Sequence, residues 1–485
     1  MSTVAGKKIA HSVSWGMIET LSVYIVRFFI GIVIARLLTP GDYGLIGMIT
    51  IFLSVSDVFV NAGFGQAYIQ KKNAGQVDAN TVFLINFILG CTVYAAFWFL
   101  APVIADFFNQ PILTILVRVF FVIIIINSLN VIQQSIIRKE LQFKRRAILT
   151  VISSVTSGVI GIVCAYSGLG VWSLVIQQIS SKTILCILLY STSPWRLTFR
   201  FSSESARSMF GYGAWLLLSN LIGTIFNQFY RFFVGKAYSP DKLGLYERGH
   251  QFESMIADTF SWVFGQVCFP VIAKIQDDIE EVRRKMNGFI RFSCFVVFPL
   301  LAILFVVAKP MIIILLTEKW VACVPLLQCF CVVGLMSPLY TFLSPLLQGL
   351  GHSRWDMTLT AFVCAGRIIN VCISYNFGLQ YIILGDFAVL LLAVVAVSLL
   401  VNRKIHYNYL TTVFGIKWVM ISTLLATLVG WLLSGVIANV YLQLFVPAVV
   451  MGIVYLAVIY VADRTLISSL VTMILKKKKN ENADR

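Results

Sequence analysis

Charged residues are scarce in this chain of 485 residues. Asp, Glu, Lys and Arg together make up 12% of it, whereas hydrophobic residues make up 59%, and the mean hydropathy is +0.88. A soluble domain covers its surface with polar groups and carries roughly 25% charged residues. An ordinary soluble protein is therefore excluded. Disorder is excluded as well, because it needs low hydrophobicity and high charge.

The sequence also lacks the motifs of enzymatic and metal chemistry. Its ten cysteines are scattered, with Cys329 and Cys331 the only close pair, and they show no zinc-site spacing. The four histidines form no HExxH pattern, and the chain contains neither a P-loop nor a GxSxG motif. We therefore expect no metal, no cofactor and no catalytic centre, which favours a carrier over an enzyme.

Long apolar runs are abundant instead. A transmembrane helix needs roughly 20 mostly apolar residues, and these runs are too long and too evenly apolar for the strands of a membrane barrel. The predicted fold class is all-α, a polytopic membrane protein with about fourteen transmembrane helices. The predicted spans are 13–37, 43–69, 80–104, 112–137, 147–167, 170–192, 210–236, 244–272, 287–307, 321–349, 355–377, 379–401, 412–436 and 440–462. The short segment 308–316 either extends the ninth span past Pro310 or lies at the membrane interface.

Lys and Arg are distributed unevenly between the two alternating sets of loops. One set carries most of them, including Lys476 to Lys479 of the C-terminal tail. The opposite set holds only Arg36, Lys236, Lys242, Lys309 and Lys319. Because positive loops stay in the cytoplasm, both termini are predicted to be cytoplasmic. Most of the net charge of +17 is thus a topology signal that also attracts anionic membrane lipids, and we expect no nucleic-acid partner.

The chain contains an internal repeat at a shift of 200 residues. The shift aligns 36–45 with 236–245, so that Pro40 and Gly44 fall on Pro240 and Gly244. It also aligns 64–66 with 264–266 and Trp15 with Trp215. A hydroxyl residue followed by Pro is typical of a helix start. We predict parallel six-helix lobes at 1–200 and 201–405, joined by a polar linker at 193–207. Residues 406–485 would add two transmembrane helices and a basic tail.

Charged side chains also occur deep within the spans. Such a charge costs several kcal/mol and usually faces a partner or a water-filled cavity. Deep cations suit an anionic substrate, and Arg pairs bidentately with phosphate. The predicted substrate-binding residues are Arg27, Arg118, Arg231, Arg367, Asn61 and Asn370. The predicted ion-coupling or gating residues are Glu19, Asp57, Glu253, Asp258 and Asp386. Each charge has the alternative of an ion pair that only stabilises the bundle, and Arg231 can simply snorkel to the interface.

Several segments carry a family resemblance. They are Ser-Trp-Gly (14–16), Ile-Ala-Arg-Leu-Leu-Thr-Pro-Gly-Asp-Tyr-Gly-Leu (34–45), Phe-Gly-Gln-Ala-Tyr-Ile-Gln-Lys-Lys (64–72), 269–278 and 318–328. The chain resembles the Wzx-type lipid-linked oligosaccharide flippases of the multidrug/oligosaccharidyl-lipid/polysaccharide exporter superfamily, and most of all their colanic-acid exporter branch. The resemblance implies two lobes around a cavity lined by arginines, with which Arg27 agrees, and two C-terminal helices that can form a groove for a lipid tail.

The resemblance also implies a function. Such a protein moves an undecaprenyl-pyrophosphate-linked oligosaccharide from the cytoplasmic to the periplasmic leaflet of the bacterial inner membrane by alternating access. Polysaccharide polymerase and glycosyltransferases would be its partners. The alternative is a cation-coupled multidrug efflux carrier on the same fold, which would need more acids than bases in its cavity. A non-enzymatic scaffold for other envelope enzymes also stays open, as do the identity of the oligosaccharide and the choice between proton and sodium coupling.

Overall fold

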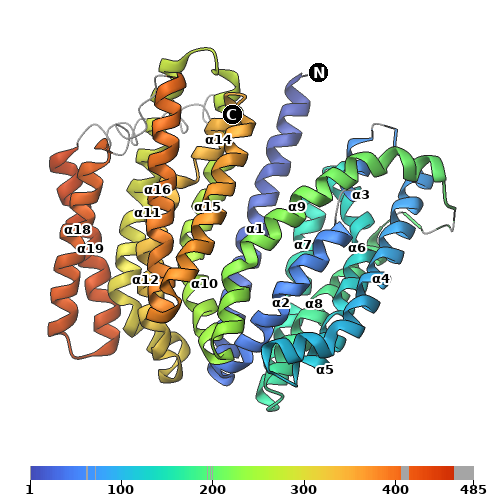
Figure 1. Cartoon of the computed structure of the whole chain (residues 1–485), viewed down its shortest axis with the longest axis horizontal. Helices are drawn as coiled ribbons and strands as arrows, with labels where there is room; N and C mark the ends of the chain where they lie inside the picture. Colours follow the sequence, from blue (N-terminus) through green and yellow to red (C-terminus); the bar gives the residue numbers. More distant parts are fainter. Residues whose placement is uncertain are drawn as a thin grey trace. The chain divides into compact units, whose positions relative to one another are not determined.

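A computed structural model describes residues 2–61, 64–71, 73–193, 195–196, 198, 200–405 and 414–463. Within these ranges every regular element is a helix (Figure 1). The chain packs as two compact units, residues 1–244 and 245–485. This division rests on contacts between helices, and it puts α9 (Ser203–Ala237) in the first unit because α9 packs on helices there. The predicted lobes 1–200 and 201–405 rest on the sequence repeat instead, and they stay a prediction.

The first unit is built from nine helices of the described chain and the start of a tenth. α1 packs on α7 and α7 on α8, while α4 packs on α6 and α9 runs along α2, α3 and α4. The helices are α1 (Ser2–Leu37), α2 (Pro40–Asn61), α3 (Phe64–Gln70), α4 (Gln76–Phe108), α5 (Leu113–Phe120), α6 (Val122–Lys139), α7 (Phe143–Tyr166), α8 (Val171–Thr192), α9 (Ser203–Ala237) and the first turn of α10 (Pro240–Lys274).

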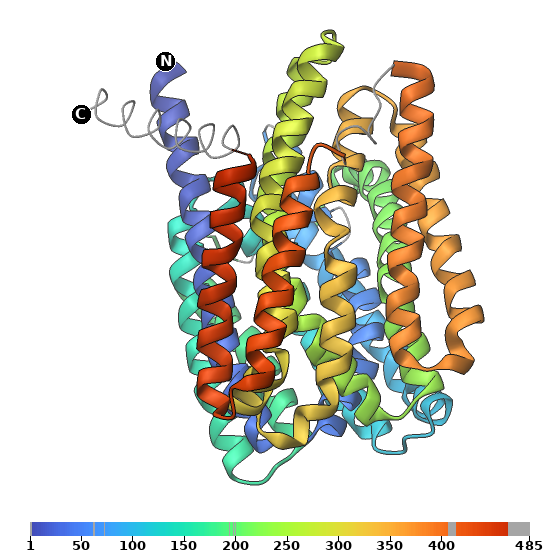
Figure 2. The same ribbon diagram turned by 90° about the vertical axis from the view of Figure 1, so that its left-hand side faces the viewer.

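The second unit continues α10 and centres on α11. α12 packs on α11 and α16, α15 packs on α16, and the red helices α18 and α19 lie side by side against α11 (Figure 2). The elements are α11 (Ile279–Leu316), η1 (Glu318–Cys323), α12 (Val324–Gly334), α13 (Ser337–Tyr340), α14 (Leu343–Gly349), α15 (Ser353–Ser374), η2 (Tyr375–Phe377), α16 (Leu379–Ile405), α18 (Lys417–Val436) and α19 (Val440–Ala462).

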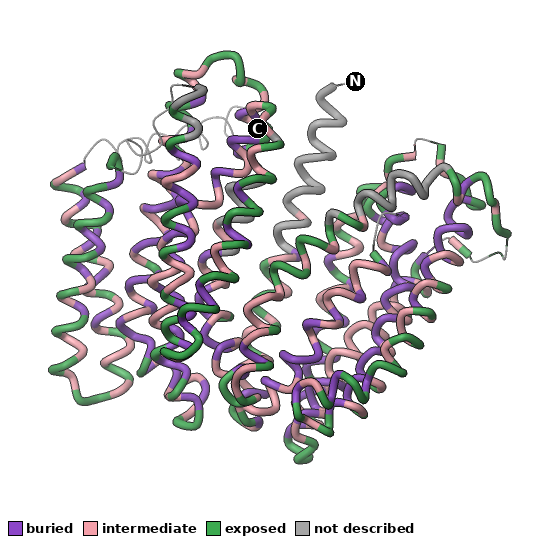
Figure 3. Tube along the Cα trace, viewed as in Figure 1, coloured by how far each residue is buried: buried purple, intermediate pink, exposed green. Residues whose placement is uncertain are grey.

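The helices have the lengths and the surface that a membrane requires. Among the described residues, twelve helical stretches are long and apolar enough to span a bilayer. α9 and α10, with 35 residues each, lie where the seventh and eighth spans are expected. Many large apolar residues are exposed, among them Leu424, Trp431 and Val461 with 67%, 63% and 76% exposure. Exposed residues recur along the helices (Figure 3). The predicted fold class, an all-α multi-pass membrane protein, is confirmed.

The helix ends bear on two local predictions. α11 runs through Pro310 to Leu316, so the segment 308–316 extends the ninth span. Within the predicted linker, Ser202 caps the start of α9 by accepting a hydrogen bond from the Ser205 N–H at 3.2 Å. Two described linker residues are held on α4, because the Asn80 amide donates to the Thr198 hydroxyl at 2.5 Å and the Ser202 N–H donates to the Thr81 hydroxyl at 3.1 Å.

The two copies of the repeat motif meet inside the first unit. Pro40 and Pro240 each begin a helix, as the sequence predicts. A Cβ atom on Gly44 would lie 1.8 Å from the Pro240 carbonyl oxygen, and one on Gly244 would lie 1.9 Å from the Pro40 carbonyl oxygen. These distances are far below van der Waals contact, so the two helix starts cross with their backbones touching, and only glycine permits this approach.

Candidate functional site

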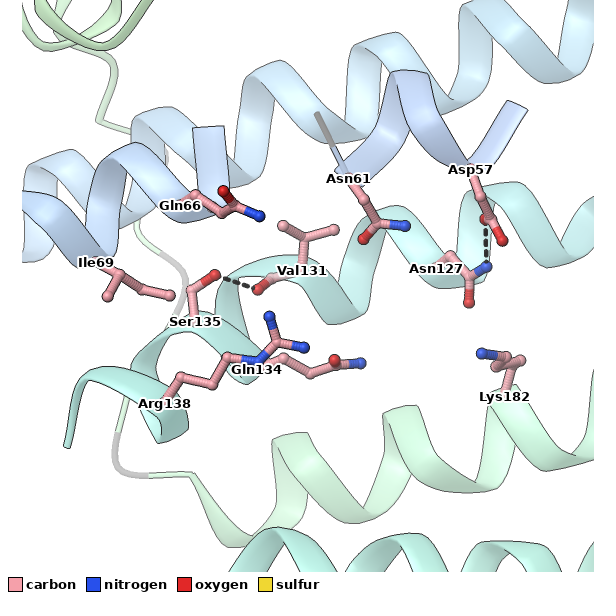
Figure 4. A pocket seen from close by; sticks show the side chains of 11 residues that line it. Asp57, Asn61, Gln66, Ile69, Asn127, Val131, Gln134, Ser135, Arg138 and Lys182 are labelled. Atoms are coloured by element: carbon pink, nitrogen blue, oxygen red, sulfur yellow. Dashed lines mark hydrogen bonds between the residues drawn. The ribbon is translucent and has the colours of Figure 1, made fainter. Parts of the chain in front are cut away.

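Four helices of the first unit, α2, α3, α6 and α8, line a polar pocket of about 300 Å³ (Figure 4). This volume is at the small end of the range typical of ligand sites. The lining residues are Asp57, Asn61, Gly65, Gln66, Ile69, Asn127, Val131, Gln134, Ser135, Arg138 and Lys182. Most of them are polar, although the surrounding sequence is strongly apolar, so the pocket is suited to a polar ligand.

Helical spacing places these side chains on common faces. α6 contributes Asn127, Val131, Gln134, Ser135 and Arg138, whose separations of three and four residues put them along one face of the helix. α2 adds two further residues that are four positions apart, one carboxylate and one amide. The pocket therefore extends from the second turn of α6 to its last, where Arg138 lies.

The hydrogen bonds between the described pocket residues do not involve the side-chain nitrogens of its two cations, Lys182 and Arg138. Asp57 accepts a hydrogen bond from the Asn127 amide at 2.8 Å, and the Ser135 hydroxyl donates to the Val131 carbonyl at 2.8 Å. Lys182 extends from α8 toward Asp57 and Asn127 (Figure 4). Its charge is attracted by Asp57, and within the part of the chain that the structure describes its ammonium makes neither an ion pair nor a hydrogen bond.

Arg138 is the second cation of the pocket. Its guanidinium makes no hydrogen bond or ion pair among the described residues, and it lies within electrostatic range of Arg146 and Glu19. Two cations against one carboxylate leave the pocket with a positive charge. Lys and Arg with unused donors bind phosphate groups, and side-chain amides such as those of Asn61 and Gln134 donate to and accept from hydroxyl groups.

Some of the residues predicted from the sequence lie in or near the pocket. Asp57 and Asn61 line it directly. Arg27 on α1 is exposed and lies within electrostatic range of Lys182. Arg231 on α9 donates to Gln228 at 3.1 Å, and Gln228 donates to Ser54 of α2 at 3.1 Å. Since Ser54 is one turn from Asp57, this chain of hydrogen bonds connects α9 to the helix that carries the pocket's carboxylate.

Other predicted residues of the first unit have different neighbours. Glu19 is buried and pairs with Arg146 of α7 at 3.2 Å, and it accepts a hydrogen bond from Thr150 at 3.3 Å. The Arg118 guanidinium lies 4.9 Å from the centre of the Trp98 ring, and its Nε donates to the Trp98 carbonyl at 3.4 Å. These contacts connect α1 to α7 and α4 to α5.

The predicted residues of the second unit join helices to one another. Arg367 of α15 makes a bidentate pair with Asp386 of α16, at 3.0 and 3.2 Å. One turn on, Asn370 is buried and donates to the Ile382 carbonyl at 2.9 Å. Glu253 of α10 is buried with its carboxylate against the backbone of Gly334 in α12. The side chain of Asp258 lies outside the described residues.

Of the pocket residues, sequence reasoning identified only Asp57 and Asn61, and it missed Lys182, Arg138 and Asn127 among the others. Lys182 lies in the middle of the sixth predicted span, where a lone lysine is itself a signal of a functional site. Arg138 falls one residue beyond the predicted span 112–137, although α6 continues to Lys139. Asn127 carries no charge, and only its position on the polar face of α6 marks it.

The fold and the site define a polytopic helical membrane protein with a net cationic pocket in its first half. A family model described as "Polysaccharide biosynthesis protein" matches residues 33–325. The match covers more than half of the chain, so the chain belongs to this family. The family resemblance predicted from the sequence is confirmed.

Individual relatives agree with this assignment. The chain is 24% identical to the "Lipopolysaccharide biosynthesis protein WzxC" of Escherichia coli K12, over 68% of each chain. It is 21% identical to the "Succinoglycan biosynthesis transport protein ExoT" of Rhizobium meliloti, over 98% of this chain and 97% of that one. Among solved structures, the "Lipid II flippase MurJ, inward closed conformation" matches with a TM-score of 0.73 at 14% identity, covering 94% of this chain and 100% of that chain. At this identity the structural match establishes the fold alone.

Proposed function

We propose that the chain is a flippase that moves an anionic lipid-linked oligosaccharide across the bacterial inner membrane. The family, the names of WzxC and ExoT, and the fold shared with the lipid II flippase support a transporter of envelope glycolipids. The cargo in this proposal is an undecaprenyl-pyrophosphate-linked repeat unit, which passes from the cytoplasmic to the periplasmic leaflet while its polyprenyl tail stays among the membrane lipids.

One observation carries the choice of headgroup. Lys182 and Arg138 face a polar pocket in the first unit with hydrogen-bond donors that no described residue occupies. An ammonium held in a span without an ion pair is costly, and an anionic ligand removes that cost. In this proposal the two cations bind the pyrophosphate, and the amides of Asn61, Gln66 and Gln134 bind sugar hydroxyls.

The transport cycle is proposed as alternating access. The pocket would be filled from the cytoplasmic side, where the distribution of basic loops predicts both termini. Ion coupling belongs to the same proposal, with Asp57 as the acid that lies in the pocket. Glycosyltransferases would supply the cargo and a polysaccharide polymerase would receive it.

A cation-coupled multidrug efflux carrier is the competing function on this fold. Its substrates are lipophilic cations, which Lys182 and Arg138 would repel from the pocket described here. The charge of the pocket therefore favours an anionic cargo over a cationic one.

The test is a complementation assay in a strain that lacks this protein, with surface polysaccharide as the readout. Lys182→Gln is expected to lower export at least tenfold, and Lys182→Arg to retain part of it. Lys144→Gln is the matched control, because Lys144 is exposed on α7 and its ammonium lies over the Trp15 ring at 5.4 Å, outside the pocket. Full export by a well-expressed Lys182→Gln variant would refute the proposed headgroup site.

A further inference from the structure

The pocket contains one group whose charge opposes the proposed cargo. Asp57 presents a carboxylate to the same cavity as Lys182 and Arg138. Among the described residues its one hydrogen bond comes from the Asn127 amide at 2.8 Å. A carboxylate has about four acceptor sites and an ammonium has three donors, so both Asp57 and Lys182 have unused capacity on the side that faces the cavity.

Asp57 and Lys182 attract one another without forming a close ion pair. Their charges interact across the pocket, yet no ion pair within 4.0 Å joins them among the described residues. Figure 4 shows the two side chains coming from α2 and α8 on either side of Asn127. The Asn127 amide holds the Asp57 carboxylate next to α6. The Lys182 ammonium therefore stays accessible to a ligand, while the carboxylate balances part of its charge.

We propose that Asp57 is an internal competitor of the anionic headgroup for Lys182. In the empty pocket the carboxylate balances the lysine charge. A pyrophosphate that enters takes over the ammonium and is repelled by Asp57, which weakens its binding and favours its release. This inference rests on the proposed function. It adds a residue, Asp57, that lowers the affinity for the headgroup and thereby speeds its release.

The physical reason is the energy of two like charges in a medium of low dielectric constant. At a separation of a few ångströms near a protein surface, such repulsion changes affinity by about tenfold or more. A transporter gains nothing from a site that holds its cargo too tightly, because the cargo must leave on the other side. A fixed carboxylate lowers affinity without removing the donors that recognise the headgroup.

The inference can be tested by measuring binding to the full-length protein in detergent, with farnesyl pyrophosphate as the probe and isothermal titration calorimetry as the method. Asp57→Asn is expected to bind the probe about tenfold more tightly than the wild type while exporting less polysaccharide in cells. Asp57→Glu, which keeps the charge, is expected to show no such gain. Asp106→Asn is the matched control, since it makes the same charge change at an exposed position of α4.

A double variant separates competition for Lys182 from a general change of charge. If Asp57 acts through Lys182, the gain from Asp57→Asn should shrink below about threefold in the Lys182→Gln background. Equal gains in both backgrounds, or an equal gain from Asp106→Asn, would contradict the proposal. Asp57→Ser provides a second neutral side chain should Asp57→Asn fail to fold, as judged by thermal unfolding.

The result also distinguishes this inference from the function on which it rests. Weaker binding by Lys182→Gln together with unchanged binding by Asp57→Asn and Asp57→Ser would overturn the competitor and leave the headgroup site standing. Wild-type binding and export by Lys182→Gln would overturn the site itself. Absence of probe binding to both the wild type and Asp57→Asn would overturn the competitor as well, because the tightened variant should be detectable.

Discussion

Gly44 and Gly244 make the same contact in opposite directions. Each lies four residues after the proline that begins its own helix, against the carbonyl oxygen of the proline that begins the other helix. Residues exactly 200 positions apart thus meet at one crossing, and the contact is between backbones. Approaches of this kind suit Cα–H···O contacts, which recur where helices pack closely.

Alanine at position 44 should destabilise the protein. The new methyl group would overlap the Pro240 carbonyl, and backbone cannot yield as a side chain can, so we expect a loss of about 1–3 kcal/mol and a fall of several degrees in apparent Tm. Differential scanning fluorimetry in detergent measures it. Gly223→Ala is the control, because a Cβ at Gly223 of α9 meets nothing within 4 Å and alanine favours a helix. Equal Tm values for the two variants would refute the contact.

The pair of Arg367 and Asp386 should behave as a helix connection. Both side chains are largely covered, with 28% and 13% exposure, so removing one partner leaves a poorly solvated charge. Arg367→Met and Asp386→Leu should each lower stability by roughly 1–3 kcal/mol, and the double variant should lose less than the sum. A thermal double-mutant cycle checks this. A singly substituted Arg367→Met protein with normal Tm but no export would instead support the substrate-binding role predicted from the sequence.

The polar linker should become accessible when its anchor on α4 is removed. Asn80 is buried and holds Thr198 through its amide, so Asn80→Ala should cost about 1 kcal/mol and free the segment around Arg196 and Arg200. Limited trypsin digestion of the purified protein should then cleave there several times faster. Thr92→Ala is the control on the same helix, because the Thr92 hydroxyl donates only to the Ile88 carbonyl of its own helix. Unchanged cleavage would show that other contacts hold the linker.

Much of the fold follows from the sequence for simple reasons. Burying an apolar span in lipid requires a minimum length, so the spans were visible as runs of residues. The helix starts at Pro40 and Pro240 were predictable because proline fits the first turn. Helix ends were less predictable, since α9 begins at Ser203 and α11 at Ile279, well before their apolar parts. Polar turns prolong these helices beyond the predicted spans.

The site was only partly predictable, because it depends on which helices are neighbours. Asp57 and Asn61 could be found as polar residues one turn apart within a span. The pairing of Arg367 with Asp386 required knowing that α15 packs on α16. Arg is the more typical phosphate ligand, yet a single lysine in mid-span, as Lys182 is, fits the same argument. The spacing of Asn127, Gln134 and Arg138 by seven and then four residues marks the polar face of α6 in the sequence.

The last two helices of the described chain, α18 and α19, take no part in lining the pocket. α18 and α19 pack on each other and on α11, where Arg291 pairs with Asp463 at 2.5 Å and the Tyr455 hydroxyl donates to the Phe295 carbonyl at 2.8 Å. Apart from each other, α18 and α19 pack mainly on one helix, α11. We therefore expect α18 and α19 to tolerate replacement as one unit more readily than α2, α3, α6 or α8, which line the pocket.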